Sequence, residues 1–130
     1  MQFSIQTTKK DEVIDISDDI EGVLSQQNAK SGICTIFVQH TTACITTADL
    51  DPGTDLDLLD ALRGTLPDIQ YRHPHDPSHA PDHILSSIIG PSVTVPFENG
   101  QLQLGVWQRV ILIELDGPRQ RNISITIIPS

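Results

Sequence analysis

The sequence predicts an α+β fold with an antiparallel, β-sandwich-like core and two or three inserted helices. Short runs rich in β-branched residues recur along the chain, turn residues separate them, and a few stretches show helical spacing of apolar residues. The chain has 130 residues, of which 38% are hydrophobic and 19% charged. This size and composition predict a single domain over residues 1–130 with a core of its own.

The first part of the chain is expected to form two strands, a helix and two more strands. β-branched and apolar residues place the four strands at 3–8, 13–17, 33–40 and 44–47. Ser17 suits a helix N-cap and two aspartates follow it, so a helix should begin there and fade near Asn28. Side-chain alternation puts Cys34 and His40 on one apolar face. Both cysteines, Cys34 and Cys44, are expected to be buried, reduced thiols.

Helical spacing returns in the middle of the chain, and strands dominate its last third. Leucines at helical spacing predict a helix over residues 55–66. Pro81 fits the first turn of a shorter helix over 82–89, which a Gly-Pro pair ends. The last strands are expected at 92–97, 101–104, 106–115 and 122–128. Asn99-Gly100 is a strong hairpin turn between the first two of them.

The acidic composition narrows the classes of partner. Asp and Glu number 17 against 8 Lys and Arg, which gives a net charge of -9. Such a chain is a poor match for nucleic acid or for an anionic membrane surface. No apolar run approaches the roughly 20 residues that span a bilayer, and the first residues lack the apolar core of a signal peptide. We therefore expect a cytoplasmic protein without nucleic-acid or membrane partners.

Four of the five histidines lie within eleven residues. They are His73, His75, His79 and His83, in a proline-rich stretch, while His40 ends an apolar run. Neutral imidazole is the commonest protein ligand for zinc, and a catalytic zinc site needs three such ligands and one open position. The pattern predicts a divalent metal site, with zinc favoured. The alternatives are a solvated loop with scattered histidines and, for His40, a hydrogen-bonded core residue.

Other polar residues suggest contacts to a phosphate-bearing ligand. The hydroxyls of Thr41 and Thr42 could bind an anion or orient His40. Glu114 shares a face of the expected strand 106–115 with Gln108, and a carboxylate there is costly unless it is paired or used. It is a candidate general base, metal ligand, or partner of an arginine. Arg119 could hold a phosphate through its planar guanidinium, and simple ion pairing is the alternative.

Several segments together resemble one family. They are Gln39-His40-Thr41-Thr42-Ala43, Tyr71-Arg72-His73, Asp82-His83-Ile84, the run 86–92, and Gly105-Val106-Trp107-Gln108 with Glu114. In order and spacing they are similar to the YjbQ family, also called secondary thiamine-phosphate synthase, over nearly the whole chain. The resemblance implies a compact α+β fold and a homotrimer with sites near subunit boundaries. The chain departs from the pattern at Ala48-Asp49, His79 and Val106.

The resemblance also implies an activity, the joining of a hydroxymethylpyrimidine diphosphate to a thiazole phosphate with release of pyrophosphate. It adds Asp57 as an acidic position at the start of the central helix. We therefore predict a metal-assisted transferase with a small phosphorylated metabolite as ligand. The expected metal ligands are His40, His73, His83 and His79; the catalytic residues are Glu114, Asp57 and His75; and the substrate contacts are Thr41, Thr42, Gln108 and Arg119. The alternatives are a non-catalytic trimeric binding module for such a metabolite and a metal-dependent phosphate-ester hydrolase.

Overall fold

Eight strands and three α-helices make up the fold, which confirms the α+β prediction. The computed structural model describes residues 1–130. The elements in chain order are β1 (Gln2–Gln6), β2 (Glu12–Asp15), α1 (Ser17–Gln26), β3 (Ser31–Val38), β4 (Ala43–Ala48), α2 (Thr54–Gly64), the 3-10 helix η1 (Pro77–His79), α3 (Ala80–Ile89), β5 (Ser92–Glu98), β6 (Gln101–Leu102), β7 (Arg109–Glu114) and β8 (Gln120–Pro129). No helix is long and apolar enough to cross a bilayer.

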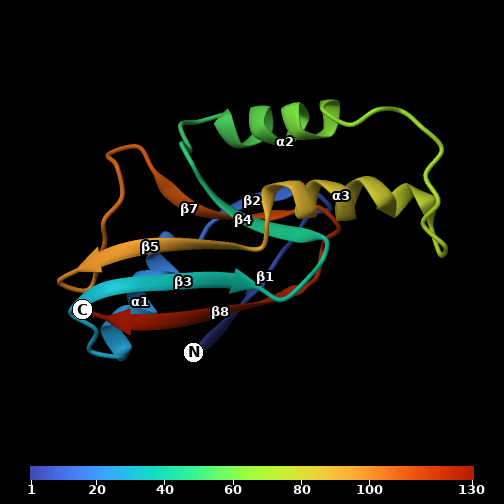
Figure 1. Cartoon of the computed structure of the whole chain (residues 1–130). Helices are drawn as coiled ribbons and strands as arrows, with labels where there is room; N and C mark the ends of the chain where they lie inside the picture. Colours follow the sequence, from blue (N-terminus) through green and yellow to red (C-terminus); the bar gives the residue numbers. More distant parts are fainter.

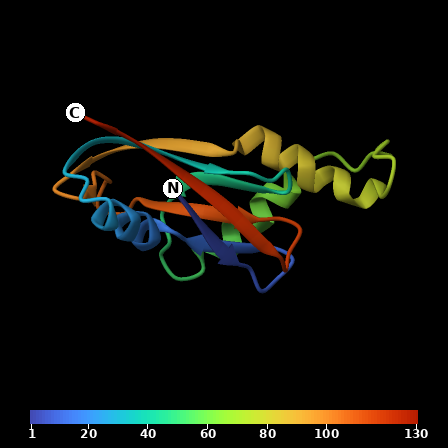
Figure 2. The same ribbon diagram turned by 90° about the horizontal axis from the view of Figure 1, so that it is seen from below.

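The strands form two antiparallel sheets. The larger sheet has the order β1-β8-β3-β5-β6, and the smaller has the order β2-β7-β4. The last strand of the sequence, β8, therefore lies inside the larger sheet, between β1 and β3. Helices α2 and α3 lie together over the smaller sheet, whereas α1 lies at the other side of the molecule (Figures 1 and 2).

Two apolar clusters hold these layers together, one on each face of the smaller sheet. Val110 and Leu112 of β7 face the larger sheet and pack with β3, β8 and α1 in a cluster of 16 buried residues. Ile111 and Ile113 point the other way and pack against Leu59 of α2 and Leu85 of α3. Strand β7 is thus buried on both faces, because its alternate side chains serve different clusters.

Two expected elements differ from the structure for local reasons. The strand expected at 106–115 begins only at Arg109, because the side chain of Gln108 folds back to accept the Gly105 N–H at 3.0 Å and closes a turn. The strand expected at 33–40 ends at Val38, so His40 lies beyond its end. Ser17 is not the N-cap: it is the first residue of α1, and its Oγ accepts the Val110 N–H at 2.9 Å.

The two cysteines are free thiols and both are buried. Cys34 belongs to the cluster between the two sheets, and Cys44 belongs to the cluster under α2 and α3. Burial raises the pKa of the Cys34 thiol to about 11 and that of the Cys44 thiol to about 12. Because the thiolate is the reactive form, we expect neither to react with iodoacetamide in the folded protein at pH 8. Mass spectrometry should find both modified after unfolding in urea. Rapid labelling of either thiol in the native protein would contradict this expectation.

Candidate functional site

His40 lies in the turn between β3 and β4, and backbone contacts fix this turn. The Gln39 N–H donates to the Asn122 carbonyl at 3.2 Å, and the Leu115 N–H donates to the Thr42 carbonyl at 3.1 Å. The Asn122 N–H donates to Nε2 of His40 at 3.0 Å. A neutral imidazole that accepts at Nε2 carries its proton on Nδ1. His40 therefore offers an N–H donor through Nδ1.

A buried ion pair lies beside this turn and joins the two sheets. Arg121 of β8 donates to both carboxylate oxygens of Glu114 at the end of β7, and both side chains are almost fully buried. Arg121 also donates to the carbonyl and the hydroxyl of Thr42, at 3.1 and 2.8 Å. The Thr7 hydroxyl donates to Glu114 at 2.7 Å. Through its two hydrogen bonds to Thr42, Arg121 therefore fixes the position of the His40 turn.

Glu114 is saturated with hydrogen-bond donors. Burial raises the pKa of its carboxyl, but the hydrogen bonds from Arg121, Thr7 and the Asp116 N–H outweigh burial and place the pKa below its usual range. A general base needs a free lone pair and a pKa near the working pH. The geometry thus favours the alternative in which Glu114 is the partner of an arginine, and that arginine is Arg121. Its catalytic role stays a prediction.

We expect the pKa of His40 to lie below its ordinary value of 6.5. Burial is the first cause, and the positive charge of Arg121 adds to it, as does that of Arg119, whereas Glu114 opposes them. The folded state therefore favours neutral His40 more than the unfolded state does. This contribution to stability is present above the unfolded pKa and is lost as the pH falls toward the folded one. An NMR titration with a midpoint for His40 at or above 6.5 would contradict this assignment.

The histidine-rich stretch forms a second group of imidazoles. The rings of His73 and His83 stack, with centroids 4.9 Å apart and an interplanar angle of 18°, and His75 meets His73 edge-on at 6.3 Å. The Asp76 N–H approaches Nδ1 of His73 at 3.4 Å. His79 lies instead beside the Asp76 carboxylate, with Nε2 at 3.4 Å. His40 makes no ring contact with any of these residues.

A network of charged side chains ties the start of α3 to the His40 end of the molecule. Asp82 of α3 is almost fully buried and binds both Arg63 of α2 and Lys10 of the β1–β2 turn. Arg63 also binds Asp11, and both Arg63 and Lys10 donate to the Leu115 carbonyl. Since His83 follows Asp82 directly, this network positions the stacked imidazoles. This network could not be predicted, because nothing in the sequence pattern marks Asp82 as buried.

Most of the cationic side chains lie in or beside one end of the molecule. We call it the histidine end and define it as the β1–β2, β3–β4 and β7–β8 turns together with residues 65–83. Four of the eight Lys and Arg residues lie there, namely Lys9, Lys10, Arg72 and Arg119, and two more lie beside it, Arg63 at the end of α2 and Arg121 near the start of β8. The Arg119 guanidinium is half exposed and pairs with Asp116. Arg72 is exposed and has no ion pair. The histidine end thus brings most of the cations of an acidic chain together, and Lys10, Arg63 and Arg119 pair there with Asp11, Asp82 or Asp116.

Two predicted site residues lie away from the histidine end. Gln108 donates through Nε2 to the Thr47 hydroxyl at 3.0 Å, near the far end of β4. Six strand positions separate Gln108 from Glu114, which is about 20 Å at 3.3 Å per residue. Asp57 is exposed in the first turn of α2, whereas the last turn of that helix carries Arg63. Within one chain, neither side chain belongs with His40.

The remaining predicted residues divide between the two imidazole groups. Thr42 is buried and its hydroxyl accepts from Arg121, whereas Thr41 is exposed beside His40. His75 is exposed, and His79 is half-exposed at the end of η1. The four histidines predicted as metal ligands are not gathered. No group of three His, Cys, Asp or Glu side chains is arranged to hold a metal ion.

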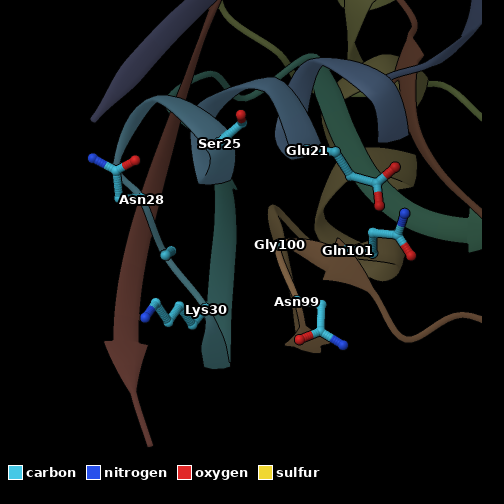
Figure 3. A pocket seen from close by; sticks show the side chains of 8 residues that line it. Glu21, Ser25, Asn28, Lys30, Asn99, Gly100 and Gln101 are labelled. Atoms are coloured by element: carbon cyan, nitrogen blue, oxygen red, sulfur yellow. The ribbon is translucent and has the colours of Figure 1, made fainter.

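A hollow lies at the other end of the larger sheet, away from the histidine end. It has a volume of about 810 Å³ and lies between the end of α1 and the β5–β6 turn. Figure 3 shows Lys30 and Glu21 on different sides of it, with Asn99 below. No histidine lines this hollow, and its only cation is Lys30. It is therefore separate from the histidine end.

Comparisons with known proteins agree along the whole chain. The model of the family described as UPF0047 protein YjbQ-like matches residues 1–130. UPF0047 protein YugU of Bacillus subtilis is 38% identical over 127 residues, which cover 97% of this chain and 96% of the relative. A UPF0047 protein of Archaeoglobus fulgidus is 32% identical over 126 residues, with 96% and 98% covered.

Solved structures share the fold. A protein of Sulfolobus solfataricus, described as YbjQ-like and of unknown function, superposes with a TM-score of 0.91 at 32% identity, covering 100% of this chain and 96% of the other. A hypothetical protein of Aeropyrum pernix gives a TM-score of 0.91 at 30% identity, with 100% and 98% covered.

These findings correct the functional prediction. None of the relatives is named a thiamine-phosphate synthase; they are named only UPF0047 proteins, and the solved structures are described as hypothetical or of unknown function. The chain also lacks a group of three side chains that could hold a metal ion. The interpretation as a metal-assisted thiamine-phosphate synthase is therefore wrong. The family resemblance on which it was based is confirmed.

Proposed function

The chain belongs to the YjbQ-like UPF0047 family, and from the geometry of its histidine end we propose that it binds a small phosphorylated metabolite there. One observation carries the proposal. The Nε2 atom of His40 accepts the Asn122 N–H, so the neutral ring has its N–H donor at Nδ1. Arg121 and Arg119 are near enough for their positive charges to act on this ring. Donors and positive charge at one point are what a phosphate oxygen requires.

The surroundings of His40 support an anionic ligand. Thr41 is exposed next to it, and the half-exposed guanidinium of Arg119 needs only to exchange its Asp116 contact to reach a ligand. A planar guanidinium binds two phosphate oxygens at once. Arg121 has no such freedom, since Glu114 and Thr42 take up its donors. It contributes charge and position instead.

We expect inorganic pyrophosphate, used as a probe, to bind the purified protein in isothermal titration calorimetry. Arg119→Ala should weaken the affinity by about tenfold or more, because a hydrogen bond to a charged group contributes about 1.5–3 kcal/mol. Lys30→Ala is the matched control, since it removes a cation from the opposite end of the molecule. Equal weakening in both variants, or no heat with the wild-type protein, would exclude a specific site at the histidine end.

Two further expectations stay proposals. The divalent metal ion could take His73 and His83 as ligands, because their rings already meet. Elemental analysis of the purified protein, with His83→Ala as the comparison, tests this cofactor directly. The homotrimer is supported by large apolar side chains that are exposed in different parts of the molecule, among them Val106, Trp107 and Ile69. Sedimentation equilibrium tests this assembly.

A further inference from the structure

We infer that the hollow between the end of α1 and the β5–β6 turn is a second binding site, and that its ligand is a short peptide with free termini. The volume of about 810 Å³ lies in the range of pockets for small ligands, roughly 300–1,000 Å³. Such pockets are usually lined by apolar side chains, whereas only one of the eight residues that line this hollow is hydrophobic. The hollow therefore selects a polar ligand. It is separate from the histidine end, and nothing in it depends on phosphate binding there.

The first wall of the hollow is the turn that ends α1. Asn28 has a left-handed backbone, with φ of 52°, directly after the helix. The Ala29 N–H donates to the Leu24 carbonyl and the Asn28 N–H donates to the Ser25 carbonyl, both at 3.0 Å. This pair of hydrogen bonds is the Schellman motif, in which asparagine is one of the residues that tolerate the left-handed position. The wall is therefore fixed by the backbone of the helix itself.

The second wall is the β5–β6 turn, and it is tied to the first. Asn99 and Gly100 have φ of 53° and 72°, as a tight two-residue hairpin turn requires. The Gly100 N–H donates to the Lys30 carbonyl at 3.1 Å, and the Leu102 N–H donates to Oε2 of Glu21 at 2.9 Å. Because two hydrogen bonds join the walls, the hollow is already formed before any ligand binds.

The α1 side of the hollow is negative. Glu21 uses only Oε2 for Leu102, and its Oε1 has no hydrogen-bond partner in the chain. Ser25 lies one turn further along the same face of α1, and its hydroxyl also has no partner. The last turn of α1 carries no basic residue, so the partial negative charge of the helix C-terminus is not balanced there. An ammonium group matches this side.

The opposite side of the hollow is positive. Lys30 is exposed, forms no ion pair and is the only cation that lines the hollow. Figure 3 shows Glu21 and Gln101 together on one side and Asn28 and Lys30 on the other. A ligand with a single charge would leave the charged group of one side unmatched. A ligand with an ammonium group at one end and a carboxylate at the other satisfies both sides.

Amide side chains supply the remaining contacts. Those of Asn28, Asn99 and Gln101 line the hollow and form no hydrogen bond within the chain. Each has a carbonyl acceptor and two N–H donors, which complement the N–H and C=O of a peptide group. Ala29 is the one apolar residue of the lining, so a large apolar side chain of the ligand would find no contact. The complementary ligand is thus a short peptide with small side chains.

Titration with triglycine, followed in amide NMR spectra, tests the site. We expect the signals of Asn28, Gly100 and Gln101 to shift, while that of His40 stays in place. N-acetyl-triglycine amide lacks both terminal charges, and free glycine lacks the peptide groups, so both probes should bind at least threefold more weakly. Absence of shifts around the hollow would overturn the inference. Equal affinity for the capped peptide or for glycine would overturn it as well, because the termini or the peptide groups would then not be recognised.

Two variants test the charged sides separately. Lys30→Met and Glu21→Gln should each weaken triglycine binding by about three- to fivefold, the upper part of the range for an exposed ion pair. The glutamine carbonyl still accepts the Leu102 N–H, so the wall stays in place. Lys9→Met is the matched control, since Lys9 is an exposed lysine at the histidine end. Unchanged affinity in the two hollow variants, or an equal loss in the control, would contradict the assignment.

Discussion

Replacement of Arg121 by methionine is expected to destabilise the fold by about 3–5 kcal/mol, the range found when one partner of a buried ion pair is removed. The variant leaves the Glu114 carboxylate buried without its cation, and Thr42 loses two hydrogen bonds as well. Urea unfolding followed by circular dichroism measures the loss. Because His40 lies on the turn that Arg121 holds, its NMR resonances should shift in the same variant.

A double variant separates the charge effect from the loss of packing. In Arg121→Met/Glu114→Leu no uncompensated carboxylate remains, and apolar replacement of a buried pair is often neutral or stabilising. We expect most of the lost stability to return. If the single variant loses less than about 1 kcal/mol, the pair does not hold the two sheets together, because a net contribution that small is typical of a solvent-exposed pair.

Leu112→Ala should cost about 3–5 kcal/mol, since removal of buried methylene groups adds a cavity term to the lost transfer free energy. Leu112 is fully buried in β7 and faces the cluster between the two sheets. The midpoint of urea unfolding should fall while the slope stays unchanged.

Leu56→Ala is the matched control, because Leu56 is 60% exposed on α2 and the same atoms are removed. We expect a change within about 0.5 kcal/mol, as for ordinary surface substitutions. A loss of similar size in both variants would mean that α2 is packed differently from the arrangement in Figure 1.

Much of the fold could be predicted from local patterns. The β-branched runs around Ile36 and Ile125 mark strands, Asn99-Gly100 marks a hairpin, and Pro81 marks the first turn of a helix. Each depends on interactions within a few residues. The turn at Gln108 was missed because its side chain accepts the Gly105 N–H and donates to the Thr47 hydroxyl, and these contacts override the apolar pattern there. The end of β3 was missed because its pairing with β8 stops at Val38, and pairing between distant strands is not visible in the local pattern.

The candidate site was predicted less well, because its contacts join residues distant in sequence. The spacing of His73 and His83 indicates that they are close only if the chain turns back, and it does: their rings stack. Nothing in the sequence indicates that Asn122 occupies Nε2 of His40. The sequence pattern also cannot tell that Gln108 lies at the other end of the smaller sheet, since strand pairing decides this position.

The place of β8 has a consequence for synthesis on the ribosome. This strand is the last of the eight to emerge, yet β1 and β3 hydrogen-bond to it from either side. Until it arrives, β1 has no neighbour at all in the larger sheet, and Ile36 of β3 lacks Ile125 across from it. The smaller sheet needs only β2, β4 and β7 and can pair earlier. The nascent chain therefore exposes the unpaired edge of β3 until β8 has emerged, and an unpaired strand edge is a template for pairing with other chains.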